Sequence, residues 1–247
     1  MKKQISIFAV AVTAIVFFSC SKQEKDIPQP NESTDSQVMS NQINQQLVFI
    51  DPLEVGLKAR YEFNGDLTDK TGQHATGIVV GSGLTYTADR NGIPNAAIKF
   101  TGTYGLDLIN IPTQAHSSVA AWVKCDSSFA SYTAIVLSPV CGPALEQVLN
   151  KFCAIISTPA TTGVVSGSYN KNWHHLVATY DGSYLKLYVD GVYIGFSANK
   201  EVLGLNEVKY FIGYNSNNSH WWGSMDDLRF YTRTLSQTDV TALYKHP

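Results

Sequence analysis

The sequence predicts an all-β domain folded as a two-sheet antiparallel sandwich, with one short helix at its C-terminal end. Charged residues make up 15% and aromatic residues 11% of the 247 residues. Tyr, Thr, Val and Gly are frequent, which favours strands around a wide buried core. Short alternating or apolar runs recur after residue 53, separated by Gly, Asn and Asp. Because the one convincing helical pattern closes the chain, strands must supply the core.

Residues 1–19 have the pattern of a secretory signal peptide. Two lysines precede an apolar run that ends at Phe18, and Ser19 stands just ahead of Cys20. The run is shorter than the roughly 18–20 residues of a membrane-spanning helix, which is the weaker alternative. The Ser19-Cys20 pair resembles a bacterial lipobox, which implies that Cys20 is lipidated. We expect a lipid-anchored protein of the cell envelope, in the outer membrane, on either of its sides.

Residues 20–52 predict a flexible polar tether that begins at the lipidated cysteine. The segment is rich in Gln, Asn, Ser and Pro over most of its length. Such a segment cannot bury enough apolar surface to fold. The folded domain is therefore expected at residues 53–247, held away from the membrane.

Eleven runs in this domain have the alternation or apolar character of strands. They are residues 57–63, 75–81, 96–100, 119–125, 133–138, 151–157, 174–180, 184–189, 193–198, 208–213 and 225–231. Asp181-Gly182 and Asp190-Gly191 separate three consecutive runs. Asp-Gly between alternating runs is the strongest short hairpin signal, so these three runs predict an antiparallel meander.

The final helix is predicted over residues 235–246. Ser236 is its expected N-cap, and Asp239 three residues later completes a variant of the capping box. Val240, Leu243 and Tyr244 follow at helical spacing. This apolar face should pack on the sandwich.

Three cysteines follow Cys20, and an exported protein can hold a disulfide. The sequence leaves the pairing open, because spacing does not set connectivity. A bridge from Cys153 to Cys141, a bridge from Cys153 to Cys125, and three buried thiols all remain possible. No Cys/His spacing suggests zinc.

Five segments of the domain carry a resemblance to a known family. In chain order they are RYEFNGDLTDKTGQHATG (60–77), AAIKFTG (96–102), VAAWVK (119–124), WHHLVATYDGSYLKLYVDG (173–191) and WGSMDDLRFYTRTLSQTDVTALY (222–244). Together they resemble a LamG-like jellyroll domain of the concanavalin A-like lectin/glucanase fold, from about residue 53 to the C terminus. The resemblance implies a two-sheet jellyroll sandwich with Trp122 and Trp173 between its sheets.

The loop at residues 66–77 and the Asp226-Asp227 pair offer oxygen ligands, which calcium requires. A jellyroll brings its first and last strands together. The resemblance implies that Asp69 and Asp226 help to bind a structural Ca²⁺, although the loop is shorter here than the usual form. The alternative is that Asp226 accepts hydrogen bonds from the backbone or from Arg229, while Asp69 sets a turn.

Residues 213–224 combine aromatic rings with amide side chains, which suits a sugar. The resemblance places Trp222 in the core, so its neighbour Trp221 should point outward in an extended run. We therefore predict a ligand site of Trp221, Tyr214, His220 and Asn217. The alternative is that Trp221 covers the sheet edge or packs under the terminal helix.

Catalysis is not expected. Retaining glucanases need two carboxylates about 5 Å apart, and no strand carries such a pair. We interpret His174 and His175 as scaffold residues, one pointing in and one out. A net charge of −2 gives no bulk attraction for nucleic acid.

The predicted function is a membrane-anchored, non-catalytic carbohydrate-binding lipoprotein, with a glycan as its partner. The alternative is a structural or protein–protein interaction module that docks onto another surface protein. A divergent polysaccharide hydrolase or lyase is the least favoured reading.

Overall fold

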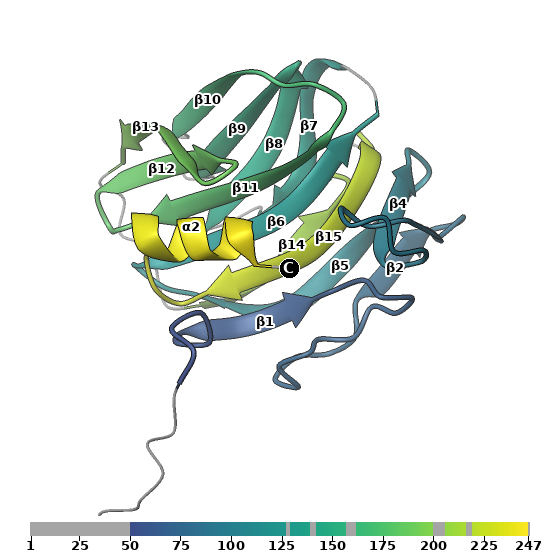
Figure 1. Cartoon of the computed structure of the whole chain (residues 1–247), viewed down its shortest axis with the longest axis horizontal. Coiled ribbons are helices and arrows are strands. Elements are labelled where there is room, and N and C mark those ends of the chain that lie inside the picture. The colour runs from purple at the N-terminus through teal and green to yellow at the C-terminus, as the bar shows by residue number, and fades with distance from the viewer. Residues whose placement is uncertain are drawn as a thin grey trace, which may run out of the picture. The chain divides into compact units, whose positions relative to one another are not determined.

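The protein folds as two antiparallel sheets that enclose a hydrophobic core, which confirms the predicted sandwich (Figure 1). The structure is a computed structural model that describes residues 50–126, 129–138, 142–156, 162–199, 206–215 and 219–246. In spatial order, sheet A contains β13 (Val192–Ala198), β12 (Tyr184–Val189), β11 (Trp173–Tyr180), β6 (Ser117–Cys125), β15 (Trp222–Tyr231), β4 (Ala97–Thr101) and β3 (Thr85–Thr87), with β1 (Leu57–Tyr61) also paired to β15. Sheet B contains β10 (Thr162–Ser168), β9 (Lys151–Ile156), β8 (Pro143–Leu149), β7 (Phe129–Leu137), β14 (Asn206–Ile212), β5 (Tyr104–Thr113) and β2 (Ile78–Gly81).

The predicted meander is confirmed, because β11, β12 and β13 pair consecutively and antiparallel. Asp190 and Gly191 have positive φ angles of 52° and 78°, as the tight hairpin turn requires. At the other turn, Asp181 Oδ1 accepts hydrogen bonds from the backbone N–H groups of Ser183 (3.1 Å) and Tyr184 (2.8 Å). Local turn chemistry therefore sets both hairpins.

Alternation along β6 decides which of its side chains enter the sandwich. Val119, Ala121 and Val123 lie in the core between the sheets, so Trp122 points to the outer face of sheet A. Trp173 is paired with Lys124 across β11 and β6, which places it on that same outer face. The prediction that both tryptophans pack between the sheets is therefore wrong.

The terminal helix α2 (Gln237–Lys245) has the predicted capping box. Ser236 Oγ accepts a hydrogen bond from the Asp239 N–H at 3.2 Å, and Asp239 Oδ2 accepts one from the Ser236 N–H at 2.8 Å. The helix lies on the outer face of sheet A, in front of β11 and β6 (Figure 1). Val240 and Leu243 are buried there. The helix thus covers one part of this face and leaves another part open.

Four strands of the structure, β3, β5, β8 and β10, were not among the predicted runs. β3 has only three residues. β5 contains Asn110, with φ of 59°, and Pro112, while β8 begins at Pro143 and contains the buried Glu146. These residue types are depleted in strands, so tertiary pairing overrides the local preference.

The two cysteines that the structure describes form no disulfide bond. Cys125 and Cys153 are buried thiols, so the predicted alternative of a bridge between them is wrong. Burial raises the pKa of each thiol to about 12. Cys141 and Cys20 lie outside the described residues, as do residues 20–49 of the predicted tether. No helix in the described part of the chain has the length and apolar character to cross a membrane.

Candidate functional site

Trp221, which was predicted to stack on a sugar, is buried in the core. Its exposed fraction is 0%, whereas Trp222 is 45% exposed. The Trp221 indole Nε1 donates a 2.9 Å hydrogen bond to Gln147 Oε1, and its ring centre lies 5.5 Å from that of Phe100. The prediction that Trp221 faces outward and Trp222 inward is therefore wrong for both residues.

A β-bulge in β15 explains this reversal. Counting back by twos from the buried Leu228 places Trp222 on the inner face. However, the register of β15 against β6 shifts just after Asp226, and one extra residue reverses the side-chain parity before it. Counting back from the buried Met225 instead places Trp221 inside. The sequence is compatible with both counts, and the position of the bulge decides between them.

Tyr214 and His220 lie together, as predicted, but not with an exposed Trp221. Their backbones form an isolated bridge, and their ring centres are 6.1 Å apart at an interplanar angle of 19°. Tyr214 is buried, and its hydroxyl donates a hydrogen bond to Asp107 Oδ1. Burial, together with this bond, raises the pKa of Tyr214. Asn217 lies outside the described residues. Because Trp221 is buried, the predicted sugar platform lacks its central ring.

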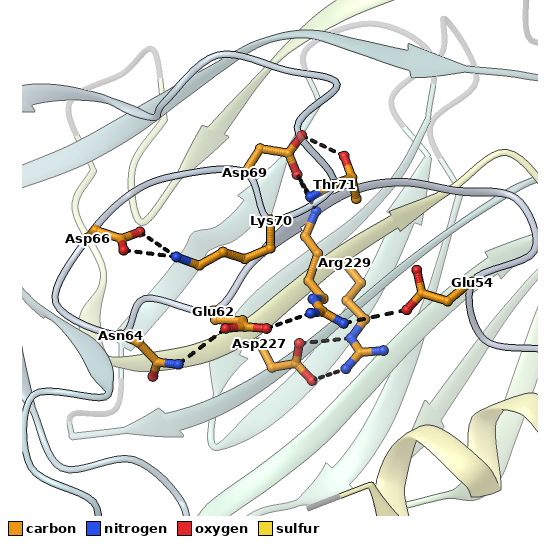
Figure 2. A network of polar contacts seen from close by, with 10 residues as sticks. Glu54, Glu62, Asn64, Asp66, Asp69, Lys70, Thr71, Asp227 and Arg229 are labelled. Atoms are coloured by element: carbon orange, nitrogen blue, oxygen red, sulfur yellow. Dashed lines mark hydrogen bonds and ion pairs between the residues drawn. The ribbon is translucent and has the colours of Figure 1, made fainter. Parts of the chain in front are cut away.

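Asp69 organises the loop that follows β1. Its two carboxylate oxygens accept hydrogen bonds from the N–H groups of Arg60, Thr71, Gln73 and His74 at 2.8–3.1 Å and from the Thr71 hydroxyl at 2.6 Å. Burial would raise the pKa of Asp69, but these bonds hold it below its ordinary value. Figure 2 shows Asp69 and Thr71 beside the ion pairs of the neighbouring polar network. The alternative in which Asp69 sets a turn accounts for this geometry.

Asp226 forms a buried ion pair with Arg90. Arg90 Nη1 donates a hydrogen bond to Asp226 Oδ2, and the two side chains are only 10% and 6% exposed. Burial raises the pKa of Asp226 to about 7, against the opposing effect of the Arg90 guanidinium. The expected partner Arg229 instead binds Asp227 through two hydrogen bonds of 2.8 and 2.9 Å (Figure 2).

As placed, Asp69 and Asp226 do not fit a shared metal ion. Asp226 lines a cavity with Arg90 and Asp227, and Asp69 is not part of that lining. Hydrogen-bond donors already engage both carboxylate oxygens of Asp69, and the Arg90 guanidinium engages Oδ2 of Asp226. Within the described ranges, no three His, Cys, Asp or Glu side chains gather in a way that could hold a metal. These positions argue against the shared site, and calcium binding itself stays an untested prediction from the sequence.

A groove of about 530 Å³ opens on the part of sheet A that the helix leaves uncovered. Strands β6 and β11 supply its floor, the C-terminal end of α2 forms one wall, and the loop between β3 and β4 forms another. We call it the tryptophan groove. Its lining residues are Arg90, Asn91, Trp122, Lys124, Asn172, Trp173, Tyr244, Lys245 and His246.

Trp122 is held in place on several sides. Its ring centre lies 5.5 Å from that of Tyr244 at an interplanar angle of 22°, and 5.2 Å from that of His175. Burial lowers the pKa of His175 to about 4, so this imidazole is neutral at pH 7. Trp122 is 9% exposed, whereas Tyr244 is 37% exposed and Trp173 is half-buried. The partly exposed rings of Trp173 and Tyr244 are thus available to a ligand.

Polar groups surround these rings. The exposed amides of Asn91 and Asn172 and the ammonium groups of Lys124 and Lys245 line the groove. This combination suits a flat polar ligand, because the rings cover apolar faces while the amides satisfy hydroxyls. The described lining contains no Asp or Glu, whereas glycoside hydrolysis in most families uses two carboxylates.

Sequence reasoning missed this groove because it assigned both floor tryptophans to the core. A signal was present in β6, where Trp122 alternates with the apolar Ala121 and Val123. No local sequence pattern indicates that Arg90, Asn91 and Lys245 line a groove, since they come from a loop and from the end of a helix.

The chain resembles proteins of known sequence and structure. A family profile described as the Concanavalin A-like lectin/glucanases superfamily matches residues 100–241. A search of curated proteins finds no match. Among solved structures, the chain is similar to domain 4 of AbnA, a GH43 extracellular arabinanase from Geobacillus stearothermophilus, in complex with arabinotriose. The TM-score is 0.66 at 22% identity, and the match covers 76% of this chain and 98% of that domain.

Two toxin domains are also similar. The binding domain of Paraclostridial Mosquitocidal Protein 1 matches with a TM-score of 0.64 at 13% identity, over 78% of this chain and 52% of that one. The binding domain of botulinum neurotoxin DC, in complex with rat synaptotagmin II, matches with a TM-score of 0.61 at 13% identity, over 77% and 51%. The chain spans about half the length of these toxin domains. At these identities, the likeness shows the fold alone.

Proposed function

The chain belongs to the concanavalin A-like lectin/glucanases superfamily, and from this premise we propose that it is a non-catalytic carbohydrate-binding module anchored to the cell envelope. Its binding site is the tryptophan groove. Its anchor is a lipid on Cys20, which lies outside the described residues and is proposed from the sequence alone.

The observation that carries the proposal is the pair of partly exposed rings in the groove, Trp173 in its floor and Tyr244 in its helix wall. Trp173 and Tyr244 offer rings to a ligand, and the amides of Asn91 and Asn172 lie at the rim. A sugar ring presents an apolar face to such a surface and hydroxyls to such amides. The arabinanase domain of similar fold was solved with arabinotriose, which supports a sugar as the class of ligand.

A non-catalytic role is supported by the chemistry of the groove. Its described lining has amide, ammonium, guanidinium and aromatic groups but no carboxylate. Asp226, one of the buried acids that line the adjoining cavity, is held by Arg90. A general acid and a nucleophile facing each other across a substrate would require two available carboxylates.

Binding to a panel of immobilised polysaccharides tests the proposal, using the full-length protein in detergent. Trp173→Ala should weaken binding by about tenfold or more, since a stacked ring contributes about 1–1.5 kcal/mol. Trp222→Ala is the matched control, because Trp222 is also exposed but does not line the groove. If wild type binds no polysaccharide, or if both variants lose binding equally, the proposal is wrong.

Docking to another surface protein is a second candidate function. It is favoured by β13, the end strand of sheet A in the described chain, where Val192 is 62%, Tyr193 44% and Phe196 58% exposed. Exposed apolar surface of this kind often marks an interaction site. Phe196→Asp should then abolish co-precipitation of an envelope protein and leave polysaccharide binding intact. If Phe196→Asp leaves co-precipitation intact and weakens polysaccharide binding, this candidate is wrong.

A further inference from the structure

We propose that the ligand of the tryptophan groove is an acidic glycan, whose anionic groups pair with Lys124 and Lys245 while a sugar ring stacks on Trp173. This inference rests on the proposed carbohydrate-binding function and specifies the class of ligand at the same site. It concerns the charge of the glycan and not the identity of its sugars.

The described lining of the groove has cationic side chains and no anionic one. Arg90 already has an ion-pair partner in Asp226. Lys124 and Lys245, in contrast, have no side-chain ion-pair partner among the described residues. The whole chain has a net charge of −2, so this local excess of cations does not reflect a generally basic protein.

Lys124 is placed to reach a ligand on Trp173. The two residues are directly paired across β6 and β11, and such pairs have Cβ atoms about 5 Å apart on one face of the sheet. A carboxylate or sulfate attached to a sugar on the Trp173 ring would therefore lie within reach of the Lys124 ammonium. On its other side, Lys124 is paired with the small, uncharged Ser224 of β15, which does not compete for it.

Lys245 approaches from the helix wall. It lies in the last turn of α2, where the carbonyl groups of the helix end carry partial negative charge. Its ammonium offsets that charge, which would otherwise repel an anion. We therefore expect Lys124 to contribute more to anion binding than Lys245.

Trp122, in the floor of the groove, has an unpaired hydrogen-bond donor within the described residues. Its indole Nε1 is buried and has no hydrogen-bond partner within the described residues. Buried donors without partners are uncommon in folded proteins.

Two matched pairs of polysaccharides test the inference on full-length protein in detergent. One pair is polygalacturonate and its methyl-esterified form, which differ in carboxylate charge. The other is dextran sulfate and dextran, which differ in sulfate. In one of the pairs, the acidic member should bind at least tenfold tighter than its neutral partner, and rising salt should weaken it.

Variants that remove lysine charges then test whether the lysines of the groove cause the preference for the acidic polysaccharide. Lys124→Gln should reduce the preference for the acidic member by about tenfold, and Lys124→Gln with Lys245→Gln should abolish it. Lys151→Gln on β9 is the control, because it removes the same charge from an exposed residue outside the groove. Unchanged thermal melting would show that the variants remain folded.

The outcomes separate this inference from the proposed function. Equal binding of acidic and neutral members, lost in Trp173→Ala, would overturn the acidic ligand and keep the carbohydrate-binding module. A preference that Lys151→Gln reduces as much as Lys124→Gln would also overturn it. Failure of every polysaccharide to bind would overturn both.

Discussion

The guanidinium carbon of Arg90 lies 5.2 Å from the centre of the Trp122 ring. The same guanidinium donates a hydrogen bond to Asp226 on β15. Arg90 belongs to the loop between β3 and β4, so these two contacts hold that loop against the outer face of sheet A. The loop is one wall of the tryptophan groove, and its position therefore depends on a buried ion pair.

Arg90→Met should destabilise the fold by up to about 3–5 kcal/mol at pH 8, because it leaves Asp226 buried without its cation, so that the carboxyl group must stay charged without a partner or take up a proton. Adding Asp226→Asn should recover part of this loss, since no buried charge then remains. Urea denaturation of both single variants and the double variant measures the coupling. Purely additive losses would show that the pair does not act as a unit.

Trp221→Ala should cost about 3–5 kcal/mol of unfolding free energy, because it empties core volume and removes the hydrogen bond to Gln147. Trp222→Ala should change stability far less, since surface substitutions usually stay within about 0.5 kcal/mol. Urea midpoints of the two variants make the comparison. Equal losses would contradict the assigned faces of β15.

Glu146 should make stability depend on pH. Burial raises its pKa from 4.5 to about 7, so between these values the folded state binds more protons than the unfolded state. Stability due to this group therefore falls as pH rises through that window. Glu146→Gln removes this dependence, so the variant should gain stability relative to wild type between pH 5 and pH 8. If the urea midpoints of Glu146→Gln and wild type differ by the same amount at pH 5 and at pH 8, the raised pKa of Glu146 is contradicted.

Calcium can be tested through the melting temperature. An ion bound by the folded state alone would stabilise it by mass action, so a chelator would lower Tm. Because Arg90 already neutralises Asp226 and five donor bonds reach Asp69, we expect Tm to stay unchanged. A chelator effect that Asp226→Ala abolishes would instead establish the site expected from the sequence.

Cys20→Ala should release the protein from the membrane fraction into the supernatant. The expected reason is loss of the acyl chains, which are the proposed anchor. Fractionation after a high-salt wash measures it, with Cys125→Ala as the control because Cys125 is a buried core thiol. Retention of Cys20→Ala in the washed membrane would refute the lipobox assignment.

The sequence by itself determined the features that depend on neighbouring residues. Asp190-Gly191 specifies a hairpin because both residues adopt positive φ. Ser236 and Asp239 specify a helix start because their side chains satisfy free N–H groups within one turn. Alternation and composition then gave the sandwich, since each strand must bury one face.

The tertiary structure alone decided which face of β15 is buried and which distant residues meet in the groove. A bulge that adds one residue just after Asp226 reverses the parity of β15, and the local pattern is compatible with either assignment. Trp122, Arg90 and Lys245 come from a strand, a loop and a helix end that are remote in sequence. Their meeting follows from long-range pairing of strands and docking of α2, which no local periodicity records.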